Sequence, residues 1–323
     1  MKVTKALQDG ISLVSRNVRM VVVIYIVNIS LALLLAIPVF SSLNRSIGKS
    51  AVREQLVQGF DYDWWAGFTF QAQGAEKTIR PSLSGGFGPL FDNLELLLTG
   101  RFTSFGVWIL VFGLAYLFLA AFFNGGVIGL FADEKRSFTV GRFFSYSGFY
   151  FNHMFALALT SILVFFLVYK LISPALFGLA GNLTASWMSE RAVWFVNLAV
   201  YLLLMFIIIL ANMILDYAKL IVIAEKKKSS WLCIWLGIKF IFKRFGRALS
   251  LYVLLSLISL AVVIVFGGIL SFLNPSQIFI LVIAFLFQQT FIFAKIWTRL
   301  NFYGAQLVFY QNEHTTVRKL KKV

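Results

Sequence analysis

The sequence is poor in cysteine and histidine, and this scarcity excludes several kinds of site. Cys233 is the single cysteine, so no disulfide can form within the chain and no metal site can be built from paired cysteines. His153 and His314 are the two histidines, and neither has an acid or a cysteine at metal-ligand spacing. The sequence therefore predicts no metal site, no cofactor and no catalytic triad.

Charge is also scarce, and the charge that is present is mostly positive. Charged residues make up 13% of the 323 residues, whereas 60% are hydrophobic and the mean hydropathy is +0.85. Soluble domains carry roughly 25% charged residues, so this composition is typical of a membrane protein. The net charge of +16 would suit nucleic acid, but most Lys and Arg lie just beyond long apolar runs. We therefore expect no nucleic acid, and as partners membrane lipids with anionic headgroups on the cytoplasmic side, or another membrane protein.

Six apolar segments are long enough to cross a hydrocarbon core of about 30 Å as helices of about 20 residues. They are Met20–Leu43, Phe105–Phe131, His153–Ile172, Ala192–Ala224, Ala248–Leu273 and Ser276–Trp297. The first has a long polar preamble and no cleavage site, so we expect it to be retained and not removed as a signal. The sequence predicts an all-α, polytopic protein forming a single membrane domain over residues 1–323, with an extracytoplasmic loop at 44–104 and a basic cytoplasmic tail at 316–323.

Basic residues are divided unevenly between the two sides of the predicted membrane. Of the 29 Lys and Arg residues, 21 lie on the side of both termini and 8 on the other side. The positive-inside rule then places both termini in the cytoplasm. Four of the five prolines, Pro81, Pro89, Pro174 and Pro275, fall in the predicted outer connections. We expect the protein in the inner (cytoplasmic) membrane of the cell.

A short pattern recurs at the inner end of every second span. "VIGLFADEKRS" and "KLIVIAEKKKSS" share an apolar run, Ala, an acid, a basic cluster and Ser, and "YGAQLVFYQNEHT" is a third, weaker copy. The closing residues are Ser137, Ser229 and Thr315, and the aligned small residues, suited to close helix approach, are Gly126, Ala218 and Gly304. The pattern predicts three tandem helical hairpins, about 3–137, 138–229 and 230–315, each entered by an amphipathic segment. Convergent basic span ends are the alternative to duplication.

Two stretches carry a resemblance to a known family. They are "GGVIGLFADEKRSFTVGRFF" and "DYAKLIVIAEKKKSSWLCIWLGIKFIFKRFGR". The arrangement resembles uncharacterised six-span prokaryotic membrane proteins related to the membrane domain found beside glycerophosphodiester phosphodiesterases. The soluble phosphodiesterase barrel has no counterpart, because no segment outside the spans is long enough to form it. The resemblance therefore implies a six-span fold and no catalytic activity.

The segment from Ser229 to Arg247 has the clearest amphipathic pattern. Aromatic and aliphatic residues recur at helical spacing, and basic residues form a row beside them. This pattern predicts a helix lying in the membrane interface, with its cations toward anionic headgroups. The candidate lipid-contacting residues are Trp231, Trp235, Lys239, Lys243, Arg244 and Arg247. The alternative is a helix that merely joins one hairpin to the next.

Polar residues inside the spans suggest a second candidate site. The intramembrane set is Asn124, Asn212, Asp216 and Gln288. An ionisable group within a span is costly, so Asp216 is the sharpest member of this set. A transport or gating role is one interpretation. One alternative is an ion pair with Lys219, one turn further on. Another is ordinary hydrogen bonding between helices, with Asn212 and Asp216 facing Gln288 or Gln289.

The long outer loop contains the third candidate site, in "GFDYDWWAGF". Asp61, Asp63, Trp64 and Trp65 combine acids with aromatics, as sugar, cation or glycoside-cleaving sites do. Asp also caps helices and Trp gathers at membrane interfaces, which is the alternative interpretation. Activity on outer-leaflet lipid would need Asp92 or Glu95 across a pocket.

Together these observations favour a non-enzymatic membrane protein, a scaffold or regulator that binds lipid or a partner protein. The alternative is a transporter or permease-like carrier with its polar cluster near Asp216, which would need polar groups gathered near the midplane.

Overall fold

The computed structural model describes residues 2–48, 61–72, 76, 107–133, 138–227, 229–273 and 278–320, and this part of the chain is all-α. Six helical segments are long and apolar enough to cross a membrane, which confirms the predicted number of candidate spans. They are α2 (Val18–Gly48), α6 (Val107–Ala132), α7 (Val140–Leu167) with its continuation, α9 (Glu190–Ala224), α11 (Phe245–Phe272) and α12 (Ile278–Leu320).

Two of these segments are longer than predicted. Helix α7 continues through a π-helical turn, η4 (Val168–Ile172), into α8 (Ser173–Thr184). Pro174 therefore lies in the first turn of a helix, where its missing N–H is tolerated, and not in an outer loop as predicted. Helix α12 has 43 residues, a length of about 64 Å, so it extends well past the predicted end at Trp297.

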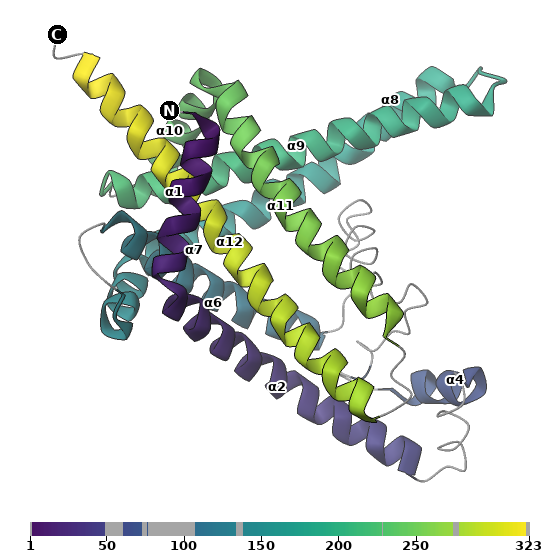
Figure 1. The fold of residues 1–323 in the computed structure, drawn as a ribbon. Coiled ribbons are helices and arrows are strands. Elements are labelled where there is room, and N and C mark those ends of the chain that lie inside the picture. The colour runs from purple at the N-terminus through teal and green to yellow at the C-terminus, as the bar shows by residue number, and fades with distance from the viewer. Residues whose placement is uncertain are drawn as a thin grey trace.

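The helices diverge from one packed region, which we call the hub (Figure 1). The hub contains α1 (Val3–Arg16), α10 (Ser230–Lys243) and the neighbouring ends of the long helices. Its largest fully buried side chains include Met20, Phe131, Phe143, Tyr217, Tyr303 and Phe309. Away from the hub the long helices expose mostly apolar side chains, and the hairpin of α7, α8 and α9 has a small core of its own.

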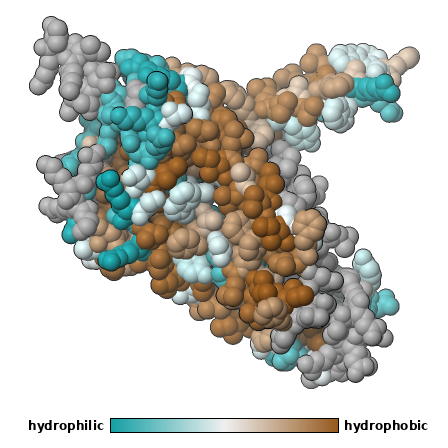
Figure 2. Space-filling model, viewed as in Figure 1, coloured by the Kyte–Doolittle hydropathy of each residue, from teal (hydrophilic) through white to brown (hydrophobic). Residues whose placement is uncertain are grey.

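Polar and charged residues gather at the hub end of the molecule, whereas the long helices that leave it are covered by apolar side chains (Figure 2). The first turn of α1, the C-terminal part of α12, the ends of α6 and α9 and the starts of α7 and α10 lie at this end (Figure 1).

Each helix that ends a predicted hairpin packs against the segment that begins another. Helix α6 packs on α7, α9 on α10, and α12 on α1, so the last pairing closes the set. The three aligned small residues lie in these contacts. A Cβ atom at Gly126 would lie 2.7 Å from the Phe143 ring, one at Gly237 would lie 3.4 Å from the Ala218 nitrogen, and one at Gly304 would lie 3.1 Å from the Gly10 carbonyl oxygen. Superposition of the three hairpins stays a prediction.

The three entry segments differ from one another. Helices α1 and α10 are separated from the following spans by breaks at Asn17 and Arg244. The second entry segment is not a separate interfacial helix, as the three-hairpin pattern predicted, but the first half of α7. Its aromatic side chains stack on α6, and the ring centroids of Phe143 and Phe123 are 5.7 Å apart. This segment therefore continues directly into the span without a break.

Candidate functional site

Helix α10 has two unlike faces. One face, with Cys233, Gly237 and Ile241, is buried in the hub. The opposite face exposes large apolar side chains, with exposed fractions of 69% for Trp231, 63% for Trp235 and 61% for Phe242. Ser229 caps the helix by accepting a hydrogen bond from the Leu232 N–H, so the sequence itself fixes where the helix begins. An exposed aromatic stripe on a docked helix is typical of the membrane interface.

The basic residues predicted to contact lipid fall into two pairs. Lys239 and Lys243 are exposed beside the aromatic stripe. Arg244 and Arg247 instead bind one buried carboxylate, because both guanidinium groups lie 2.8 Å from Glu313 on α12. This pair of contacts fastens the break between α10 and α11 to the long C-terminal helix. Lysine, and not arginine, therefore supplies the free positive charge of this surface.

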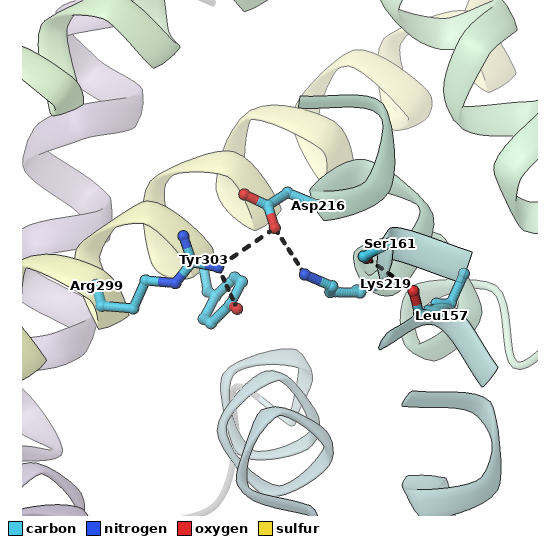
Figure 3. A network of polar contacts seen from close by, with 6 residues as sticks. All are labelled: Leu157, Ser161, Asp216, Lys219, Arg299 and Tyr303. Carbon is cyan, nitrogen blue, oxygen red and sulfur yellow. Dashed lines mark hydrogen bonds and ion pairs between the residues drawn. The ribbon is translucent and has the colours of Figure 1, made fainter. Parts of the chain in front are cut away.

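Asp216 lies in a buried ion cluster between α9 and α12 (Figure 3). Its residue is 1% exposed, and its Oδ1 atom lies 2.9 Å from the Lys219 ammonium and 3.6 Å from the Arg299 guanidinium. The ion pair with Lys219, one of the predicted alternatives, is present. Arg299 also donates a hydrogen bond of 3.0 Å to the Tyr303 hydroxyl and lies 4.9 Å from the centre of that ring.

Sequence reasoning missed Arg299 and Tyr303, because it ended the sixth span at Trp297 and counted Arg299 among the boundary cations. The available signal was the spacing of Lys295, Arg299 and Tyr303, which share one face of a continuous helix at steps of four.

The other members of the predicted intramembrane set do not join Asp216 through side-chain hydrogen bonds. Gln288 is exposed, and Asn124 and Asn212 are half-buried. Gln289, the neighbour of Gln288, accepts a hydrogen bond of 3.1 Å from Tyr25 on α2. Hydrogen bonding of Asn212 and Asp216 with Gln288 or Gln289 stays a prediction, and the contact seen among the described residues joins Gln289 to α2 instead.

The outer-loop acid Asp61 acts as a helix cap. Its carboxylate accepts hydrogen bonds from the backbone N–H groups of Asp63 and Trp64 at 2.9 and 3.0 Å, and so begins α4 (Tyr62–Gln71). Trp64 stacks on Phe68 within the same helix, and Trp65 lies at 5.7 Å from that ring. Asp92 and Glu95 lie outside the described residues. The capping interpretation therefore accounts for Asp61.

A second ionic cluster joins the ends of α9 and α12 at the surface of the hub. Glu225 accepts a hydrogen bond from the Tyr310 hydroxyl and lies 3.3 Å from His314 and 3.6 Å from Lys227. At the matching position of the repeat, Asp133 accepts a hydrogen bond of 2.8 Å from Tyr146. Burial, and secondarily the charge of Glu225, raises the pKa of the nearby Cys233 thiol to about 11.

A shallow groove lies between α1, α11 and α12. Apolar side chains from all three helices line it, together with Thr298 and Asn301. The Oδ1 atom of Asn301 is buried there without a hydrogen-bond partner among the described residues. None of the four predicted intramembrane polar residues lines this groove.

No protein-family profile, characterised protein or solved structure matches this chain. The resemblance to the six-span membrane domain therefore stays a prediction.

Proposed function

We propose that the chain is a multi-pass protein of the inner cell membrane that binds anionic phospholipid at its hub end, as a scaffold or regulator without catalysis of its own. Its termini lie in the cytoplasm in this proposal, as the distribution of basic residues predicts.

The observation that carries the proposal is the exposed face of α10. A soluble surface would not place Trp231, Trp235 and Phe242 together, since contiguous apolar patches on water-facing surfaces are avoided. Lys239 and Lys243 border this stripe on one side. Aromatic rings in the headgroup region and lysines toward phosphate would satisfy both groups at once.

The rival functions have less support from the same contacts. A carrier would need Gln288 within a polar cluster, whereas Gln288 is exposed. An outer-leaflet lipid enzyme would need Asp61 or Asp63 across a pocket from Asp92 or Glu95. Asp61 caps α4, and Asp92 and Glu95 lie outside the described residues, so no described contact supports this function. We therefore favour lipid binding over transport or hydrolysis.

The test compares lipid retention by the full chain. The protein, purified in mild detergent, would be titrated with phosphatidylglycerol or phosphatidylcholine, and bound lipid counted by native mass spectrometry. Wild type should prefer phosphatidylglycerol. Each lysine near an anionic surface contributes about 1 kcal/mol, so Lys239→Gln with Lys243→Gln should lower that preference by about 30-fold at low salt, and by less as salt is raised.

The matched control removes two charges that lie away from the hub. Both residues are exposed in the hairpin of α7, α8 and α9, Lys170 in η4 and Arg191 in the first turn of α9, so Lys170→Gln with Arg191→Gln should leave the preference unchanged. Equal retention of the two lipids by wild type, or equal loss in both double variants, would contradict the proposal.

A further inference from the structure

The ion cluster around Asp216 carries one unbalanced positive charge. Asp216 supplies one carboxylate, and Lys219 and Arg299 supply two cations around it (Figure 3). Both helices of the cluster are candidate membrane spans, Glu190–Ala224 and Phe279–His314. A net charge at such a position is costly unless water or a counter-ion reaches it. A bound anion would balance this charge and stabilise the cluster.

Arg299 is the member that an anion could reach. Its side chain is 50% exposed, whereas that of Lys219 is 11% exposed and that of Asp216 is 2% exposed. Its hydrogen bond to Tyr303 and its stacking on that ring hold the guanidinium plane in one orientation. An arginine held in this way binds phosphate through two parallel N–H donors.

Lys295 is a second cation on the same face of α12. It precedes Arg299 by four residues, is exposed, and has its ammonium 5.8 Å from the centre of the Phe291 ring. Two like charges at this spacing destabilise a helix on their own, whereas an anion between them reverses the sign of that interaction. The Lys295 ammonium lies toward Phe291 and the Arg299 guanidinium toward Tyr303, so Lys295 adds positive charge one turn before Arg299 without sharing its hydrogen bonds.

The surroundings indicate a lipid and not a free ion. The same side of α12 exposes Ile292 and Phe285, at 36% and 58%. A phospholipid with its phosphate at Arg299 could therefore place its acyl chains against the apolar side chains of α12, whereas a free anion would make no use of them.

We propose that Arg299, held in place by Asp216 and Tyr303, binds the phosphate of an anionic phospholipid, and that Lys295, one turn before it on α12, adds positive charge to this site. This site rests on the proposed lipid-binding function but uses residues far in sequence from α10. It would hold one lipid tightly, whereas the α10 surface attracts many weakly.

The experiment measures the tightest lipid-binding step of the full chain in detergent, by native mass spectrometry with phosphatidylglycerol. Arg299→Gln should weaken that step by about tenfold or more, since it removes charge-assisted hydrogen bonds to phosphate. Arg45→Gln, which removes an exposed arginine at the opposite end of α2, is the matched control and should leave it unchanged. Lys239→Gln with Lys243→Gln should also spare this step, which separates failure of this site from failure of the α10 surface.

Two further arms decide between the possible outcomes. Lys295→Gln removes a cation that makes no ion pair with the described residues, so it should fold normally and weaken the tight step; this arm decides the matter if Arg299→Gln does not fold. Inorganic phosphate at millimolar concentration should not displace the lipid. Unchanged lipid affinity in Lys295→Gln or in folded Arg299→Gln, or full displacement by phosphate, would overturn the site.

Discussion

At the scale of single residues, Cys233 shows how burial controls chemistry in this chain. The thiol lies on the packed face of α10, and its pKa is raised to about 11, above its ordinary value of 9.0. The thiolate is the reactive form, so a raised pKa means that the folded protein holds the unreactive thiol at neutral and mildly alkaline pH.

We therefore predict that Cys233, which is fully buried and whose thiol pKa is raised, resists maleimide in the folded protein at pH 8. Alkylation quenched at successive times, followed by mass spectrometry, would give the rate at which Cys233 is modified. Unfolding in denaturant should restore rapid reaction at pH 8, since both burial and the neighbouring Glu225 charge are then lost. Rapid labelling of the folded protein at pH 8 would show that this face of α10 is open.

Asp216 marks what can and cannot be predicted at this scale. Its pairing with Lys219 follows from a spacing of three residues within one helix. Its contact with Arg299 joins residues 83 positions apart in the numbering, and no local rule specifies such a pairing. The ion pairs of Glu313 with Arg244 and Arg247 also join residues far apart in sequence, so no local rule predicts them either. They occupy two of the four basic residues predicted to contact lipid.

At the scale of elements, hydropathy predicted the long helices well because apolar length is a local property. It predicted their ends less well. Helix α12 continues to Leu320 because Tyr303, Phe309 and Tyr310 bury their rings in the hub, and tertiary contacts of this kind are absent from a hydropathy window. Helix α7 likewise continues across Pro174 with the help of a π-helical turn, where a proline alone predicts a loop.

The small residues at the helix contacts give a prediction for one pair of elements. A Cβ atom at Gly126 would clash with the Phe143 ring at 2.7 Å, whereas one at Gly113 in the same helix would meet nothing within 4 Å. We expect Gly126→Ala to destabilise the protein by about 1–3 kcal/mol through overpacking. Gly113→Ala should instead be neutral or stabilise by up to about 1 kcal/mol, because alanine favours helix.

Thermal or SDS-induced unfolding in detergent would compare these two alanine variants directly. Because both replace a glycine in α6, their difference isolates the contact with α7 from helix propensity. Equal stability of the two would mean that α6 and α7 are more loosely packed than the structure indicates.

At the scale of the whole molecule, the hub determines how the chain can sit in a bilayer. Six candidate spans leave it, and α1, α10 and the ends of α6, α9 and α12 lie at the hub end (Figure 1). The cations of α1, α10 and the end of α9 are at this end as well, whereas Met188, in the connection between α8 and α9, lies at the far end of its hairpin and is fully exposed. The cations of these described elements therefore lie together at the hub end of the molecule.

The side that faces the cytoplasm can then be tested with two single cysteines. Ser12 is on the exposed polar face of α1 at the hub, and Met188 is at the opposite end. Because basic residues are retained on the cytoplasmic side, we expect a membrane-impermeant maleimide to label Met188→Cys in intact cells and Ser12→Cys only after permeabilisation. Replacing Cys233 with serine in both proteins removes the remaining thiol. Labelling of Ser12→Cys in sealed cells would show that the orientation is the opposite one. The α10 lysines and the Arg299 site would then lie at the outer surface of the membrane.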